Sequence, residues 1–166
     1  MIVAGETVVL RPLVADEVDE LVRNAESAEG RIGGPHSREE LLQRVESSGR
    51  FVGGKLDLAV EVDGRFAGTI QARSPEQFMP PGICELGIVL LPETRGRGVG
   101  TEACRLLARY LLDNGFARVQ ASTDVENVAM RRALEHAGFT FEGVMRAFMP
   151  KGEGGRRVDY ALYALT

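Results

Sequence analysis

The pattern of apolar and polar residues along the chain changes repeatedly between the period of a strand and the period of a helix. Short runs rich in β-branched and apolar residues, bounded by turn residues, predict strands. These runs are Thr7–Leu13, Leu58–Val62, Arg65–Ala72, Cys84–Leu91, Arg118–Thr123, Thr140–Phe148 and Arg157–Leu165. Asp63 and Gly64 form a preferred two-residue turn and predict a hairpin. The last two runs flank a turn-rich segment, and we expect them to form an antiparallel pair.

Other segments place apolar residues three or four positions apart, which is the spacing of a helix with one buried face. They are Asp16–Ser27, Ser37–Val45, Thr101–Asn114 and Asn127–Ala137. The second begins with a capping box of Ser37 and Glu40, and the last two are followed by glycine. Because strands and helices alternate without a repeat or a linker, the pattern predicts one α/β domain over residues 1–166.

Composition narrows the class of protein. A chain of 166 residues has the size of one domain. Its net charge of -4 argues against a nucleic-acid-binding protein, which would carry a basic surface. No apolar run approaches 18 residues, and the first residues lack the pattern of a secretion signal. The two cysteines lack metal-site spacing. We therefore expect a cytoplasmic protein without a metal and without a membrane or nucleic-acid partner.

One short segment, ETRGRGVGTEAC at residues 93–104, carries the strongest chemical signal. It lies between a predicted strand and a predicted helix, and alternates three glycines with two arginines: Gly96, Gly98, Gly100, Arg95 and Arg97. Uncovered N–H groups at Gly98, Val99 and Gly100 would converge on the positive end of the helix, which binds anions readily. A tight turn alone also favours glycine, but it does not explain the arginines. The segment therefore favours a phosphate site.

Two common nucleotide motifs do not fit. In a dinucleotide fingerprint that starts at Gly96, Thr101 stands where the third glycine belongs. The run from Gly49 to Lys55 matches G-x-x-x-x-G-K, but Leu56 replaces the required serine or threonine. It also joins a helix to a strand, which is the reverse of the required order. Neither motif predicts a nucleotide site here.

The spacing Arg95-x-x-Gly98-x-Gly100 resembles the R/Q-x-x-G-x-G/A signature of the GCN5-related N-acetyltransferases (GNAT). The run ELGIVLLPETRGRGVGTEA and the later Asn127, Ala137-Gly138-Phe139, Phe141-Glu142-Gly143 and Asp159 are similar to the RimJ/RimL branch of that family. The resemblance covers nearly the whole chain and is weakest over residues 28–57. It implies a mixed, twisted, largely antiparallel sheet flanked by helices. In that fold, the strand Cys84–Leu91 splays from its neighbour.

The resemblance also implies a cosubstrate, acetyl-coenzyme A, and the residues that hold it. Its pyrophosphate would bind at Arg95, Arg97, Gly98, Val99 and Gly100. Main-chain groups of Ile88 and Leu90 would bind the acetyl carbonyl and the pantetheine amides. Asn127 would cap its helix and touch the cofactor. Arg131 would either meet a cofactor phosphate or lie in solvent as an ordinary surface arginine.

Glu85 is the one acidic residue within the strand Cys84–Leu91. A carboxylate in an apolar strand costs free energy unless it is paired or lies in a cleft. It is therefore either the general base for the incoming amine, directly or through water, or a carboxylate paired with a neighbouring cation. An acidic residue is common here in the RimJ/RimL branch. The usual general acids are absent, because Leu134 and Met130 occupy their positions.

Together with these residues, the resemblance implies an acetyl-CoA-dependent N-acetyltransferase that works by direct attack in a ternary complex. A lysine amine with a pKa near 10.4 is neutral in only about 0.04% of molecules at pH 7, whereas an α-amine has a pKa near 8. A single carboxylate therefore suits a protein or peptide N-terminal α-amine. The alternatives are a small-molecule amine, such as a polyamine or an antibiotic, and a non-catalytic acyl-CoA-binding module. We expect a monomer or a two-fold homodimer.

Overall fold

A computed structural model describes residues 1–26, 37–75, 79–151 and 155–166 of the chain. Within these ranges eight strands form one sheet in the order β1-β2-β3-β4-β5-β6-β8-β7. The strands are β1 (Val3–Ala4), β2 (Val8–Arg11), β3 (Lys55–Val62), β4 (Arg65–Arg73), β5 (Ile83–Leu90), β6 (Arg118–Asp124), β7 (Thr140–Pro150) and β8 (Arg157–Leu165). Neighbouring strands are antiparallel except β5 and β6, which are parallel. The mixed, largely antiparallel sheet predicted from the sequence is confirmed.

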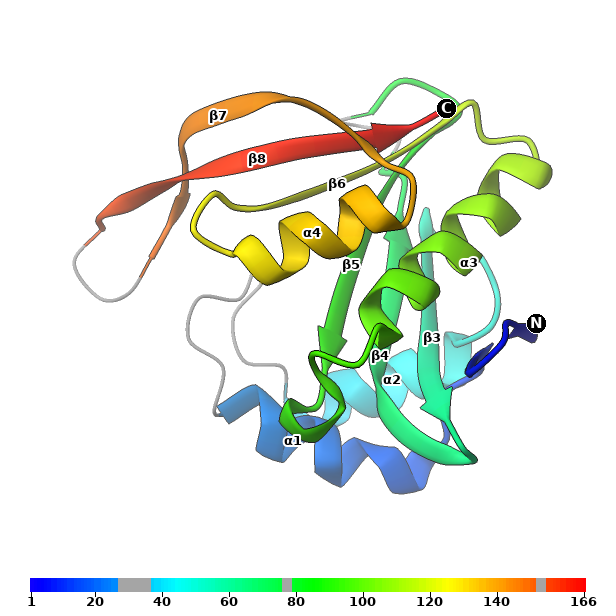
Figure 1. The fold of residues 1–166 in the computed structure, drawn as a ribbon. Coiled ribbons are helices and arrows are strands. Elements are labelled where there is room, and N and C mark those ends of the chain that lie inside the picture. Colours follow the sequence, from blue (N-terminus) through cyan, green and yellow to red (C-terminus); the bar gives the residue numbers. More distant parts are fainter. Residues whose placement is uncertain (27–36, 76–78, 152–154) are drawn as a thin grey trace.

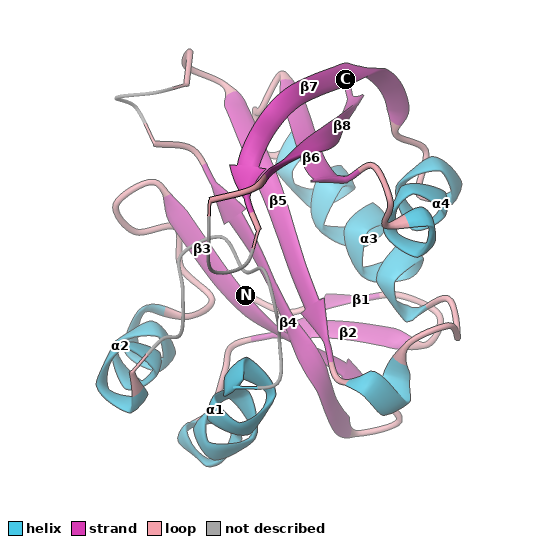
Figure 2. Ribbon diagram, turned by 90° about the vertical axis from the view of Figure 1, so that its left-hand side faces the viewer, coloured by secondary structure: helices cyan, strands magenta, loops and turns pink. Residues whose placement is uncertain are grey.

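Helices cover both faces of this sheet (Figures 1 and 2). They are α1 (Val18–Glu26), α2 (Arg38–Ser47), α3 (Val99–Asp113) and α4 (Val128–His136), with short 3₁₀ turns at Ala15–Glu17 and Pro92–Thr94. Helices α3 and α4 lie on one face and α1 and α2 on the other (Figure 2). The predicted helices are therefore confirmed, except that the end expected at Ser27 lies outside the described residues.

The main core lies between the sheet and α3. Apolar residues of α3 at helical spacing, including Leu107 and Leu111, are buried against Ile70 of β4 and Val119 of β6. Burying such side chains contributes about 1.5–3 kcal/mol each. A smaller cluster that includes Val18, from α1, closes the opposite face.

From Thr69 onward, successive side chains of β4 point to opposite faces of the sheet, apolar ones into the main core and polar ones away from it. Ile70 and Ala72 are fully buried in the main core, so Thr69, Gln71 and Arg73 lie on the opposite face, toward α1 and α2. The hairpin that orders this strand turns at Asp63 and Gly64, whose φ values are 51° and 72°. Positive φ at both positions is the geometry that the sequence predicted for this turn.

Candidate active site

The two neighbours of strand β5 pair with different parts of it, β4 with Glu85–Leu90 and β6 with Ile83–Leu86. Its pairing with β4 continues as far as Leu90, opposite Gly68, but its pairing with β6 ends at Leu86. Strand β6 continues to Asp124 while paired with β8 on its other side. A gap therefore opens between β5 and β6 beyond Leu86, and Figure 1 shows the two strands diverging there. This is the splayed strand that the resemblance to the GNAT family implied.

The main chain of β5 presents polar groups to this gap. The Gly82 carbonyl accepts hydrogen bonds from Ala117 and Arg118, at the start of β6, whereas the Leu91 N–H donates to Ala67 on β4. Successive residues of a strand direct their backbone groups to opposite sides. Even-numbered residues therefore face β6, and Ile88 and Leu90 direct their N–H groups into the gap.

The glycine-rich loop connects β5 to α3 beside this gap. Gly98 is the N-cap of α3 with φ 81°, and no side chain caps the helix there. The first N–H groups of a 15-residue helix are therefore left open to an anion. A Cβ placed on Gly100 would lie 3.6 Å from Leu90 Cδ1, so this helix end adjoins the end of β5. The structure thus joins the predicted phosphate site to the gap.

The two arginines of the loop differ in their contacts. Arg95 donates from Nε and Nη2 to the carbonyl oxygen of Leu90, at 3.0 Å and 2.9 Å. Its guanidinium therefore ties the loop to the end of β5, and the Leu90 carbonyl has its partner within the protein. Arg97 is exposed and makes no hydrogen bond or ion pair with the described residues. Of the two, Arg97 is the cation left open to a ligand.

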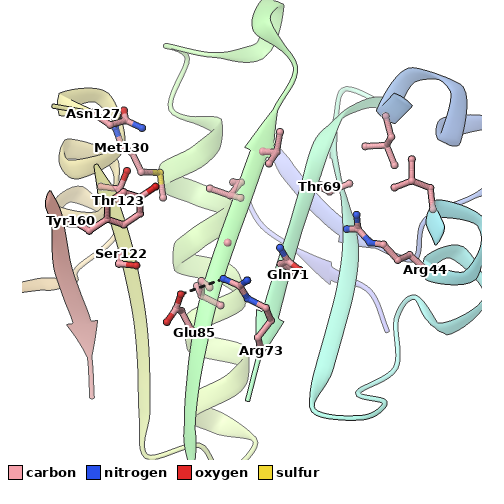
Figure 3. A pocket seen from close by; sticks show the side chains of 16 residues that line it. Arg44, Thr69, Gln71, Arg73, Glu85, Ser122, Thr123, Asn127, Met130 and Tyr160 are labelled. Atoms are coloured by element: carbon pink, nitrogen blue, oxygen red, sulfur yellow. Dashed lines mark hydrogen bonds and ion pairs between the residues drawn. The ribbon is translucent and has the colours of Figure 1, made fainter. Parts of the chain in front are cut away.

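A pocket of about 250 Å³ lies on the α1 and α2 face of the sheet and reaches the gap. Figure 3 shows that polar side chains from β4 and α2 lie on one side of β5, and that side chains from β6, α4 and β8 lie on its other side. Its polar lining residues are Arg44, Thr69, Gln71, Arg73, Glu85, Ser122, Thr123, Asn127 and Tyr160. Burial raises the pKa of Tyr160.

Glu85 lies in this pocket with about a fifth of its side chain exposed. Its Oε1 lies 3.2 Å from Arg73 Nη2, and its Oε2 accepts a hydrogen bond of 3.3 Å from Gln120. The pairing with a neighbouring cation that the sequence left as one alternative is present. Among the described residues, Glu85 is also the one acidic residue that lines the pocket. The geometry is therefore compatible with both a general base and a carboxylate held in an ion pair.

Asn127 and Arg131 have different outcomes. Asn127 caps α4 by accepting a 3.1 Å hydrogen bond from the Met130 N–H, as predicted, and it lines the pocket. Arg131 donates to the hydroxyl of Tyr163 and to the carbonyl of Val125, both at 3.1 Å. Its Nε and Nη1 are therefore engaged within the protein, while Nη2 has no partner among the described residues; the contact with a cofactor phosphate stays a prediction. The position expected for a general acid, Leu134, is buried in the core.

Both cysteines are buried and lack nucleophilic character. Burial raises the pKa of Cys84 to about 11 and that of Cys104 to about 12. Since the thiolate is the reactive form, neither side chain fits a covalent intermediate. No group of three or more metal-ligating His, Cys, Asp or Glu side chains occurs among the described residues.

Several pocket residues were not singled out from the sequence. Gln71 and Arg73 could have been found from the alternation along β4, because polar residues occupy every second position of this strand from Thr69 onward. No sequence pattern identifies Arg44 as a pocket residue, because a single arginine on a helix is usually an exposed surface charge. Tyr160 lies in an apolar strand, where an aromatic residue reads as core.

Comparisons with known proteins identify related chains. A family model described as an acetyltransferase (GNAT) domain matches residues 7–140. A crystal structure of a GCN5-related N-acetyltransferase from Brucella melitensis is 30% identical, covers 99% of this chain and 78% of its own, and has a TM-score of 0.73. No curated protein gives a significant match.

Two further solved structures share the fold at lower identity. RimL, a ribosomal L7/L12 α-N-protein acetyltransferase in complex with coenzyme A, is 19% identical, with 99% of this chain and 97% of that chain covered and a TM-score of 0.82. RimJ of Mycobacterium smegmatis, in complex with a CoA disulfide, is 21% identical, with coverages of 96% and 81% and a TM-score of 0.78. None of the described helices is long and apolar enough to cross a membrane.

Proposed function

The chain belongs to the GNAT family of acetyltransferases, and we propose that it transfers the acetyl group of acetyl-coenzyme A to the α-amine of a peptide or protein. The observation that carries this proposal is the gap between β5 and β6, which opens beside the uncapped N-terminus of α3 and into the polar pocket. A thioester in the gap and an amine in the pocket would meet there in one ternary complex.

The loop and β5 supply the groups that hold the cosubstrate. The N–H groups of Gly98, Val99 and Gly100 suit the pyrophosphate, because they lie at the positive end of α3. Arg97 adds a charged donor. Arg95 acts through its hydrogen bonds to Leu90, which fix the direction of the loop. Asn127 lines the pocket at the start of α4.

The reaction needs an oxyanion donor and a proton acceptor. The N–H of Ile88 faces the gap and would stabilise the negative charge that develops on the acetyl oxygen as the amine attacks. Glu85 would take the proton of the incoming ammonium, directly or through water. The C–N bond then forms, the C–S bond breaks and coenzyme A leaves as a thiolate, which takes up the second proton that the nitrogen loses as it becomes an amide. A thiolate needs little assistance, because a free thiol has a pKa of roughly 8.5.

An α-amine fits this apparatus better than a lysine amine. Deprotonating a lysine amine at pH 7 costs roughly 4–5 kcal/mol, whereas an α-amine costs about 1 kcal/mol. Glu85 is the one carboxylate that lines this pocket among the described residues. The fold shared with RimL, whose name specifies an α-N-protein acetyltransferase, supports the same choice.

The direct experiment compares two matched peptides with acetyl-coenzyme A. One carries a free α-amine and no lysine, and the other has an acetylated N-terminus and one lysine. We expect thiol release and a mass gain of one acetyl group with the first peptide. Faster acetylation of the second peptide, or of a polyamine, would overturn the choice of acceptor. Binding of coenzyme A without turnover of any amine would indicate a non-catalytic module.

A further inference from the structure

Near Glu85, two hydrogen-bond donors of the pocket lining lie close to Gly87. A Cβ placed on Gly87 would lie 3.3 Å from Gln71 Nε2 and 3.8 Å from Arg73 Nη2, and no other atom would be closer than 3.3 Å. Because Gly87 carries no side chain, none projects from this position toward the two nitrogens. Gly87, Gln71 and Arg73 all line the pocket, so an oxygen atom of a bound molecule can approach both donors there.

The side chains of Gln71 and Arg73 both have N–H groups without a hydrogen-bond partner among the described residues. The side chain of Gln71 makes no hydrogen bond with the described residues, and Arg73 uses only Nη2, in its contact with Glu85. Arg73 is 28% exposed, so its remaining N–H groups can reach a ligand in the pocket. Arginine presents its donors in a planar fork that matches the two oxygens of a carboxylate.

A group of charged residues lies behind these donors, and of its members only Arg44 lines the pocket. Arg44 donates from Nε and Nη2 to Oδ1 of Asp57, at 3.0 Å and 2.6 Å, while Lys55 Nζ lies 3.3 Å from Oδ2. One buried carboxylate thus faces two cations. Asp57 is paired in register with Gln71, on the face of β3 and β4 that bears the pocket. These described residues, together with Arg73 and Glu85, amount to three cations and two carboxylates, and this balance favours an anion.

Glu85 and Arg73 together present opposite charges that are 3.2 Å apart. An acceptor with an ammonium group and a nearby carboxylate has the complementary arrangement, because its ammonium can meet Glu85 while its carboxylate meets Arg73 and Gln71. Building on the proposed function, we propose that the pocket selects acceptors that carry a carboxylate close to the reacting amine. In a peptide, this is an N-terminal residue Asp or Glu. Arg73 and Gln71 are then specificity-determining residues.

The test uses lysine-free, C-terminally amidated peptides that differ only in the first residue, Glu against Gln and Asp against Asn. The isosteric pairs change the charge and hardly change the size. A charge-assisted hydrogen bond in a pocket corresponds to roughly 10- to 100-fold. We expect kcat/KM to be higher by that factor for the acidic member of each pair. Equal values for both members would overturn the inference and leave the proposed function standing.

Variants locate the preference. Arg73→Gln should bring the Glu-to-Gln ratio close to one, and Arg73→Lys should retain part of it. Gly87→Ala should lower the ratio, because its methyl group would displace Gln71 and Arg73. Arg65→Gln is the matched control, because Arg65 is exposed on the same strand and does not line the pocket. The ratio cancels any loss of activity shared by both peptides. A full ratio in folded Arg73→Gln would contradict the assignment.

Free amines distinguish a failure of this inference from a failure of the proposed function. As free acceptors, glutamate and glutamine are compared by kcat/KM with each other, and each is compared with the amine that its decarboxylation gives. If no peptide is acetylated but acidic free amines are preferred, the peptide acceptor is wrong and the carboxylate subsite stands. If neither set shows an acidic preference, the subsite is wrong, whether or not the peptides react.

Discussion

Arg95 holds the carbonyl oxygen of Leu90 with two hydrogen bonds, from Nε at 3.0 Å and from Nη2 at 2.9 Å. The contact joins the last residue of β5 to the loop that leads into α3. The charge of Arg95 suggests direct phosphate binding, but its guanidinium fixes the loop instead. The open N–H groups at Gly98–Gly100 therefore keep a defined direction relative to the gap.

This contact predicts that lysine cannot replace Arg95. Arg95→Lys keeps the charge but loses the two-pronged contact, so it should weaken coenzyme A binding by about as much as Arg95→Gln, roughly tenfold. Arg97→Lys should bind nearly as well as the parent, because Arg97 contributes charge. Isothermal calorimetry at two salt concentrations measures both. If Arg95→Lys matches the parent and Arg95→Gln does not, Arg95 is a phosphate ligand instead.

Gly98 is predicted to be essential for the cosubstrate and inessential for the fold. A side chain at Gly98 would cover the first N–H groups of α3 and would be strained at φ 81°. Gly98→Val should therefore abolish measurable binding of coenzyme A. Gly115→Val is the matched control, because Gly115 has φ 98°, equally open surroundings and a place at the other end of α3. Equal coenzyme A affinity in the two folded variants would place the site elsewhere.

Gly68 is predicted to be required for the close approach of β4 and β5. Its φ is 145°, and an added Cβ would overlap the carbonyl oxygen of Val89 and lie 2.8 Å from Leu90 Cα. Gly68→Ala should lower the free energy of unfolding by about 1–3 kcal/mol. Gly87→Ala, where the nearest atom is a flexible side-chain nitrogen at 3.3 Å, should cost clearly less. Urea unfolding of both variants measures the difference, and equal losses would contradict the account.

The cysteines are predicted to be silent in the folded protein. Because burial raises the pKa of Cys84 to about 11 and of Cys104 to about 12, both stay protonated at pH 8. A thiol reagent at pH 8 should titrate no thiol in the native protein and two after unfolding. Rapid native labelling, or acetyl transfer to the protein itself, would reopen a covalent mechanism. The same result lets coenzyme A thiol be followed directly during turnover.

Local patterns predicted most of the fold. The period of apolar residues placed the helices, and Asp63-Gly64 predicted the hairpin because that turn needs positive φ at two residues. The glycine loop also followed from sequence, since its chemistry lies in consecutive backbone groups. Strand β1 was missed because two residues, Val3 and Ala4, are too few to show a period.

The partners of long side chains could not be predicted in the same way. Arg131 reads as a surface cation on α4, yet it is committed to Tyr163 on β8. Arg73 meets Glu85 because the register of β4 and β5 places them opposite each other. Neither contact depends on neighbours in sequence, so only the assembled sheet identifies them. For Glu85, the sequence left two alternatives, a general base and a carboxylate in an ion pair. The structure shows the ion pair with Arg73, and it does not exclude the role of general base.

The most direct measurement compares Glu85→Gln with the parent in steady-state acetylation of a peptide α-amine between pH 6 and 9.5. Glu61→Gln is the control, because Glu61 is a strand carboxylate paired with Arg11 outside the pocket. If Glu85 is the base, Glu85→Gln keeps its affinity for coenzyme A and loses roughly 10²–10⁴ in turnover at neutral pH. The loss then shrinks as pH rises and the free amine accumulates. Unchanged turnover of Glu85→Gln at pH 6 would contradict the account.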